Sequence, residues 1–191
     1  MYYKFIITCI LVPFFISCSN NSNKNNINSE NINIASPEKQ YIEAMGKFDN
    51  QQFEEAIIIF SNIEKIFPLS NESIQSQIML AFIDYIKLEY DSAIIKYTRI
   101  IKKYPSLKNI DYVYYMRALC YYEQISHEGL DGEYNTLALE NLNQVINRFP
   151  NSQYAKDSLQ KIILVKSNIA AKHMTIARFY QKNNKFTAAL N

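Results

Sequence analysis

The sequence predicts an all-helical protein in which helix-turn-helix units stack into a right-handed superhelical solenoid. One reason is composition: only three of the 191 residues are glycine, and folds that depend on tight turns need more. The other reason is a spacing that occurs three times, in which a large apolar residue follows an alanine by four positions and a proline follows eight positions later. The three sets are Ala56, Phe60 and Pro68, then Ala93, Tyr97 and Pro105, then Ala138, Leu142 and Pro150.

This spacing is typical of the tetratricopeptide repeat. The two helices of such a repeat cross closely and need alanine at their contact points, while proline ends the second helix because it cannot donate a backbone hydrogen bond. Ala44 and Ala81 stand twelve residues before the first two alanines of the pattern, where the first helix of a repeat needs a small residue. We therefore expect a repeat domain over residues 37–191, with repeats at about 37–70, 71–107 and 108–151.

A fourth, incomplete copy is expected to run from residue 152 or 170 to residue 191. Its register places its start near Ala170 and sets Ala177, Phe186 and Ala189 at the spacing of the earlier copies. This copy stops one turn into its second helix. Because a solenoid needs a polar element at each end, the sequence predicts either a chain truncated at its carboxyl end or an end that a partner covers.

The amino-terminal residues have the features of an export signal. Lys4 precedes an apolar run, Phe5–Ile16, that is too short to span a bilayer. The residues Phe15-Ile16-Ser17-Cys18 resemble the cleavage box of bacterial lipoproteins, in which a small residue precedes the cysteine that receives the lipid. The resemblance implies a signal peptide at 1–17, a covalent lipid such as palmitate on Cys18, and, with serine next to that cysteine, sorting to the outer membrane. The alternatives are an ordinary signal peptide or an uncleaved anchor.

Residues 18–36 are expected to form a disordered tether that begins with the lipidated cysteine. The stretch from 19 to 36 is rich in asparagine and has no apolar period, so it cannot repay the entropy cost of folding. Ser36-Pro37-Glu38 then provides a capping serine, a proline at the first helical position and an acidic first turn, which predicts the start of the first helix.

The residues that usually carry catalysis or metal binding are sparse. The chain has two histidines, His127 and His173, and they do not form a metal-ligand cluster with the cysteines. Once Cys9 leaves with the signal peptide and Cys18 is acylated, Cys120 is the remaining thiol, in a helix where cysteine usually acts as a small apolar residue. A formal charge of +2 is too small to favour nucleic acid. We therefore expect a protein that is not an enzyme and has no metal or cofactor beyond the lipid.

A row of aromatic and aliphatic side chains is predicted to line the concave face, which the first helix of each repeat should form. Rigid aromatic rings bury a large area at a small entropy cost, and they suit an extended peptide that ends in an aromatic residue. The alternative is that these side chains are core between helices. The predicted groove residues are Tyr41, Met45 and Phe48 in the first repeat, Ile78, Phe82 and Tyr85 in the second, and Tyr115, Leu119 and Tyr122 in the third.

Three stretches carry a resemblance to a known family. They are Asn109–Leu119 (NIDYVYYMRAL), Tyr121–Ser126 (YYEQIS) and Arg148–Ala155 (RFPNSQYA), and together they resemble BamD, the tetratricopeptide lipoprotein family of the β-barrel assembly machinery. The insertion at 127–134, which breaks the repeat spacing, also lies where that family carries one. Members usually have five repeats, so the resemblance implies that this chain lacks the last one to one and a half.

The resemblance implies a non-catalytic scaffold on the periplasmic face of the outer membrane. Its expected partners are the periplasmic domains of the barrel assembly protein, accessory lipoproteins and the carboxy-terminal segments of unfolded outer-membrane proteins. The last repeats of the family carry much of the contact with the assembly protein. The alternatives are a periplasmic tetratricopeptide adaptor of the cell-envelope or division machinery, and a helical domain associated with an enzyme.

Overall fold

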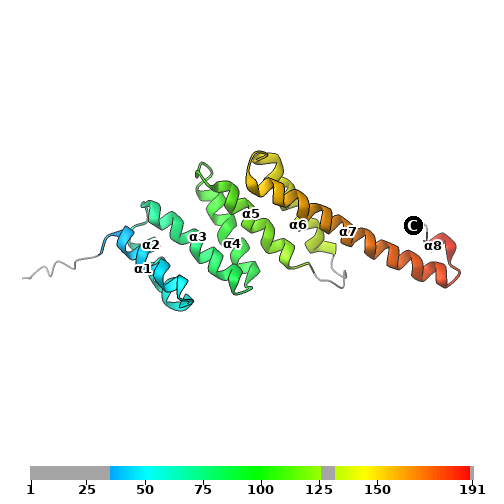
Figure 1. Ribbon diagram of the computed structural model, residues 1–191, viewed down its shortest axis with the longest axis horizontal. Helices are drawn as coiled ribbons and strands as arrows, with labels where there is room; N and C mark the ends of the chain where they lie inside the picture. The colour runs from blue at the N-terminus through cyan, green and yellow to red at the C-terminus, as the bar shows by residue number, and fades with distance from the viewer. Residues whose placement is uncertain (1–34, 126–131, 190–191) are drawn as a thin grey trace, which may run out of the picture. The chain divides into compact units, whose positions relative to one another are not determined.

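The computed structural model describes residues 35–125 and 132–189, which form helices and no strand, so the predicted all-helical fold is confirmed. These residues lie in a unit that spans Ala35–Asn191. The signal peptide, Cys18, most of the tether and most of the insertion lie outside the described residues. The helices (Figure 1) are α1 (Pro37–Asp49), α2 (Phe53–Ile66), α3 (Asn71–Ile86), α4 (Tyr90–Lys103), α5 (Ile110–Glu123), α6 (Gly132–Arg148), α7 (Gln153–Lys182) and α8 (Phe186–Ala189).

The helices pack in two layers. Each helix contacts the next one along the chain, and α1, α3, α5 and α7 also contact one another in succession. Within the described ranges α2, α4 and α6 make no such contacts with one another. We call α1, α3, α5 and α7 the inner layer and α2, α4 and α6 the outer layer. This arrangement of antiparallel pairs is the tetratricopeptide-type solenoid that the sequence predicts.

The alanine framework lies where helices cross. A methyl side chain lets two helix backbones approach closely, and any larger side chain at these points would separate them. All of the framework alanines in the first three repeats are fully buried, as are the large residues that follow in the second helices. They are Ala44, Ala56, Ala81, Ala93 and Ala138, with Ala118 at the position in the third repeat that Ala81 has in the second, followed by Phe60, Tyr97 and Leu142.

Each proline of the pattern stands two residues beyond the end of an outer helix. The helices α2, α4 and α6 end at Ile66, Lys103 and Arg148, and the next residue is aromatic each time. A residue before proline avoids helical backbone angles, and Phe67 accordingly has φ −122° and ψ 54°. The predicted role of Pro68, Pro105 and Pro150 in ending these helices is therefore confirmed.

Serine side chains start two of the inner helices. Ser70 Oγ accepts a hydrogen bond from the Ser73 backbone N–H at 3.0 Å at the start of α3. Ser152 Oγ accepts one from the Tyr154 backbone N–H at 3.2 Å at the start of α7. Each cap satisfies a backbone donor that the first turn of a helix leaves free.

The corner between the two helices of a repeat has the same geometry in three places. At each corner one residue adopts a left-handed conformation: Gln51 with φ 60°, Leu88 with φ 62° and Asn184 with φ 57°. The backbone N–H of the next residue then donates to a carbonyl five residues back, as Gln52 does to Lys47 at 2.9 Å. This is the usual carboxyl-terminal cap of a helix, in which a left-handed residue satisfies the free carbonyls of the last turn.

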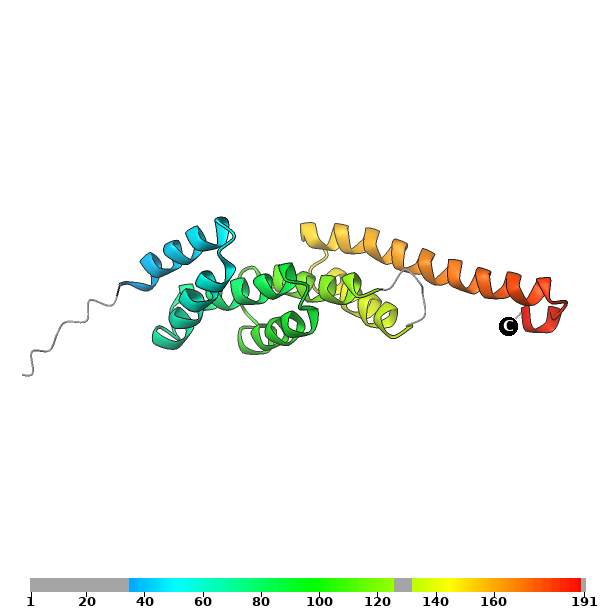
Figure 2. The ribbon, with the colours of Figure 1, turned by 90° about the horizontal axis from the view of Figure 1, so that it is seen from below.

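The last helix pair corrects one expectation. No helix starts near Ala170, because α7 runs as one helix of 30 residues from Gln153 to Lys182 (Figure 2). The segment contains neither glycine nor proline, so nothing interrupts its backbone hydrogen bonds. Its first half packs against the third repeat, and its second half pairs with α8. The register of the fourth copy itself agrees with the others, since Phe186 begins α8 as Phe53 begins α2.

Candidate peptide-binding site

The predicted groove residues all lie in the inner layer, but they differ in burial. Seven of them are half-buried and pack with one side against the core: Tyr41, Met45, Phe48, Phe82, Tyr85, Tyr115 and Tyr122. Ile78 and Leu119 are only 7% and 8% exposed and belong to the core. The alternative that the sequence left open, a core position between helices, fits the burial of these two residues. Binding by the other seven stays a prediction.

The first two repeats carry a continuous series of aromatic rings. Phe48 of α1 lies 5.6 Å from Phe53 of α2 and 6.0 Å from Phe82 of α3, measured between ring centroids. Phe82 stacks on Tyr85 at 6.2 Å, and Tyr85 meets Tyr90 of α4 at 5.7 Å. Ring pairs at these separations attract each other beyond their shared burial. The series links four helices and holds half-buried rings in fixed positions along the inner layer.

The third repeat continues the aromatic surface with tyrosines that have polar partners. Tyr115 of α5 stacks on Tyr154 of α7 with ring centroids 5.0 Å apart, and its hydroxyl donates to Asp157 Oδ2 at 2.5 Å. The ammonium group of Lys161 lies 4.7 Å from the Tyr122 ring centroid, within cation–π range. These contacts tie α5 to the first half of α7 and give this part of the surface hydrogen-bonding groups.

Three tyrosines of the inner layer, Tyr85, Tyr112 and Tyr115, have a raised pKa and are neutral at physiological pH. Burial, with the nearby Glu123 carboxylate, raises the pKa of Tyr85 to about 12, and burial raises the pKa of Tyr112 to about 12. Burial and the hydrogen bond to Asp157 raise the pKa of Tyr115 further above its usual range. A protonated hydroxyl both donates and accepts hydrogen bonds, so the rings offer an apolar face and a polar edge without negative charge.

A cavity of about 380 Å³, which we call the inner pocket, opens between α3, α5 and α7. Its apolar lining is Ile78, Met79, Tyr112 and Tyr154, and its polar lining is Gln75, Asn109, Asp111 and Gln153. All these residues belong to inner-layer helices or to the residue before α5. One predicted groove residue, Ile78, therefore borders a cavity although it is almost fully buried.

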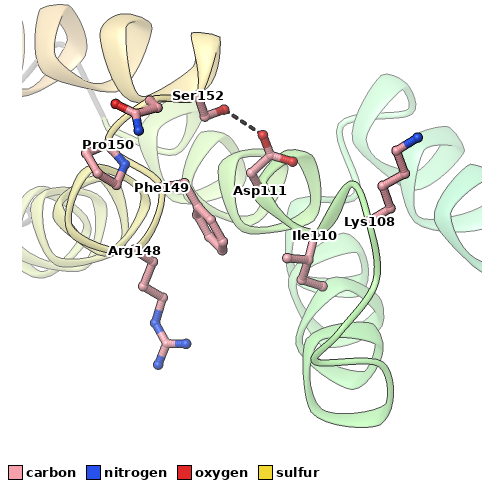
Figure 3. A pocket seen from close by; sticks show the side chains of 8 residues that line it. Lys108, Ile110, Asp111, Arg148, Phe149, Pro150 and Ser152 are labelled. Atoms are coloured by element: carbon pink, nitrogen blue, oxygen red, sulfur yellow. Dashed lines mark hydrogen bonds between the residues drawn. The ribbon is translucent and has the colours of Figure 1, made fainter.

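A second cavity, which we call the tip pocket, lies at the end of α6 and the start of α5 and α7 (Figure 3). It holds about 350 Å³ and has two cations in its lining, Lys108 and Arg148. Ser152 Oγ donates to Asp111 Oδ2 at 2.6 Å, and this bond appears as the dashed line in Figure 3. Asp111 lines both pockets.

The inner pocket was not predicted from the sequence. Asp111 and Tyr112 precede the first predicted groove position of the third repeat, and Gln75 precedes that of the second. Tyr154 follows all of the predicted positions. The helix starts could have indicated this pocket. Five of its lining residues lie in the first turn of α5 or α7 or directly before α5. First turns of neighbouring inner helices meet at one edge of the layer, and a count made from the mid-helix alanines does not reach that edge.

The described residues offer no group of three histidine, cysteine, aspartate or glutamate side chains that could hold a metal ion. Cys120 is fully buried in α5, and burial raises the pKa of its thiol to about 12. A thiol in that state is a weak nucleophile at neutral pH. In the part of the chain that the structure covers, no helix combines the length and the apolar character needed to cross a membrane.

Residues 34–191 match the model of a protein family described as YfiO, outer membrane lipoprotein. Curated relatives include the outer membrane protein assembly factor BamD of Caulobacter vibrioides, which is 34% identical over 150 residues, 78% of this chain and 49% of that protein. BamD of Rickettsia prowazekii is 33% identical over 79% of this chain and 60% of its own length. BamD of Neisseria gonorrhoeae is 28% identical over 82% of this chain and 62% of its own length. The chain thus spans between about half and three-fifths of these relatives.

Proposed function

This chain belongs to the YfiO family of outer membrane lipoproteins, and from that premise we propose that it is a non-catalytic scaffold in the assembly of outer-membrane β-barrel proteins. In this role it docks on the periplasmic domains of the barrel assembly protein, beside accessory lipoproteins, and receives segments of unfolded outer-membrane proteins. A lipid on Cys18 holds it at the periplasmic face of the outer membrane. The names of the curated relatives support the assembly role.

The observation that carries the proposal is the half-buried aromatic surface of the inner layer. Phe48, Phe82 and Tyr85 are each packed against the core on one side and in ring contact with a neighbour. Such rings lose little rotamer entropy when a ligand covers them, because the fold already fixes their orientation. An unfolded barrel strand presents an apolar side chain at every second residue, with aromatic residues near the strand ends, and the ring series offers these side chains apolar contacts.

Site-specific photocrosslinking tests the peptide-binding role. A photoreactive phenylalanine analogue at Phe82 should crosslink to a urea-unfolded outer-membrane β-barrel protein after dilution into buffer. The same analogue at Ile95 is the matched control, since Ile95 is 69% exposed on the outer helix α4 and lies away from the inner layer. Crosslinking at Ile95 that equals or exceeds crosslinking at Phe82 would contradict the proposed location of the groove.

The membrane anchor has a separate test. Replacing Cys18 by serine should move the protein from the membrane fraction to the soluble periplasmic fraction, because several acyl chains on one cysteine supply the anchoring energy. The alternative reading, an adaptor of the cell-envelope or division machinery that is normally soluble, predicts the same distribution for both forms. Fractionation followed by immunoblotting distinguishes these two cases.

Docking on the assembly protein is tested by copurification. The protein is extracted in mild detergent and captured through an affinity tag, and the expected companion is a protein with repeated periplasmic domains and a membrane barrel. Recovery of the chain alone under these conditions would argue against the docking role. It would leave the peptide-binding role to be decided by the crosslinking experiment.

A further inference from the structure

Asp111, which lines the inner pocket, has no charged partner among the described residues. One of its oxygens accepts the Ser152 hydroxyl at 2.6 Å. Across the described residues, its other oxygen has no hydrogen bond, and no lysine or arginine nitrogen lies within ion-pair distance of either oxygen. Figure 3 shows the Arg148 side chain pointing away from Asp111. A half-buried carboxylate without a counter-ion attracts a cation more strongly than a fully solvated one does.

The rest of the inner pocket suits the side chain that would bring such a cation. The aromatic rings of Tyr112 and Tyr154 lie 5.7 Å apart between centroids, and both residues line the pocket together with the apolar side chains of Ile78 and Met79. Aromatic faces attract ammonium and guanidinium groups, and an apolar wall accommodates the methylene stem of lysine or arginine. No basic residue is among the residues that line this pocket.

We propose that the inner pocket receives a lysine or arginine side chain of a polypeptide bound along the inner layer. The inference rests on the proposed function, since it states which side chain the bound polypeptide places between α3, α5 and α7. The cation meets the free oxygen of Asp111, the stem lies against Ile78 and Met79, and the tyrosine rings flank it. The same arrangement disfavours an acidic side chain or a carboxyl terminus, because either one would place a second negative charge beside Asp111.

Three labelled peptides of about ten residues test the inference with the purified full chain in detergent. Each peptide alternates aromatic and polar residues and has lysine, norleucine or glutamate at its centre, so the three differ in one side chain. Lysine and norleucine share the same four-carbon stem and differ in charge. Fluorescence anisotropy measures their affinities at low and high salt. We expect the lysine peptide to bind about fivefold more tightly than the norleucine peptide, the glutamate peptide to bind most weakly, and added salt to reduce both differences.

Two variants assign the effect to the pocket. Asp111→Asn removes the charge but keeps an oxygen that can accept the Ser152 hydroxyl, and it should abolish the lysine preference. Asp91→Asn is the matched control, because Asp91 is also the second residue of a helix, on the outer helix α4. Asp91→Asn changes the net charge and the charge at a helix start by the same amount as Asp111→Asn does, and it should preserve the lysine preference. Thermal unfolding followed by circular dichroism checks that both variants are folded.

The outcomes separate this inference from the function on which it rests. Equal binding of all three peptides, or a lysine preference that survives in Asp111→Asn, would overturn the basic-side-chain pocket and leave the aromatic groove standing. Failure of every peptide to bind would count against the groove and therefore against both. Loss of the preference in Asp91→Asn as well would assign the effect to the general charge of the protein, which also overturns the pocket.

Discussion

Replacing Tyr97 by phenylalanine is expected to stabilise the fold. Tyr97 is fully buried in α4, in the position that Phe60 occupies in the first repeat. Its hydroxyl has no hydrogen-bond partner among the residues that the structure describes, and burial raises the pKa of that hydroxyl far above its usual range. The second repeat therefore buries a polar atom at a position where the first repeat has only hydrocarbon.

The magnitude follows from two opposing terms. A buried polar group without a partner costs about 1–3 kcal/mol, and removal of the oxygen loses van der Waals contacts worth about 0.5 kcal/mol. The net gain for Tyr97→Phe is thus about 1 kcal/mol, which corresponds to a rise in Tm of about 2–4 °C for a domain of this size. The converse substitution, Phe60→Tyr, places a hydroxyl in the matching position of the first repeat and should cost about 1–3 kcal/mol.

Urea and thermal unfolding, followed by helical circular dichroism, measure both variants against the parent chain. The reasoning is refuted if Tyr97→Phe lowers the free energy of unfolding by about 1 kcal/mol or more, because such a loss means that the hydroxyl makes a favourable hydrogen bond. A neutral effect of Phe60→Tyr would show that the position tolerates a buried hydroxyl at no cost. That result would contradict the argument in the same way.

Three further predictions concern a corner, an ion pair and the alkaline limit of stability. Gln51→Gly should raise the free energy of unfolding by about 0.5–1 kcal/mol in urea titrations, since relief of the left-handed φ of Gln51 outweighs the added freedom of the unfolded chain. Asn184→Gly should change this free energy less, because asparagine tolerates the left-handed conformation. Lys96→Met should lower the free energy of unfolding by about 2 kcal/mol. Lys96 Nζ lies 2.7 Å from the Asp84 carboxylate, and the Asp84 side chain, which is 7% exposed, would be left buried without its counter-ion. Raising the pH from about 10 to 12 should lower the free energy of unfolding, since Tyr112 loses its proton near its ordinary pKa of 10 when unfolded and only at about 12 when folded. Tyr112→Phe should flatten this part of the pH profile, measured by urea unfolding.

The helix pairs were predictable because their signals act locally. An alanine at a helix crossing and a proline just past a helix end have steric consequences that do not depend on the rest of the fold, so Ala56, Ala93, Pro68 and Pro105 mark the repeats correctly. The unbroken α7 was predictable in principle, since no glycine or proline interrupts Gln153–Lys182. Repeat counting imposed a start near its middle, where the chain has no signal for one.

The candidate site was less predictable because its properties depend on neighbours. The repeat register places Tyr85 and Leu119 on the same type of helix face, yet one is half-buried and the other is in the core. That difference depends on which side chains the adjacent repeat supplies. The inner pocket combines Gln75, Asp111 and Tyr154 from three repeats, and no spacing within a single repeat can reveal such a meeting.

The unbroken α7 also has a mechanical consequence. At about 1.5 Å per residue, its 30 residues form a rod of about 45 Å, with Tyr154 of the inner pocket in its first turn and α8 beyond its far end. A rod of this kind works as a lever: a tilt of about 5° at the first turn moves the opposite end by about 4 Å. A displacement at the α8 end would therefore be transmitted along one continuous helix to Tyr154, which lines the inner pocket together with Asp111.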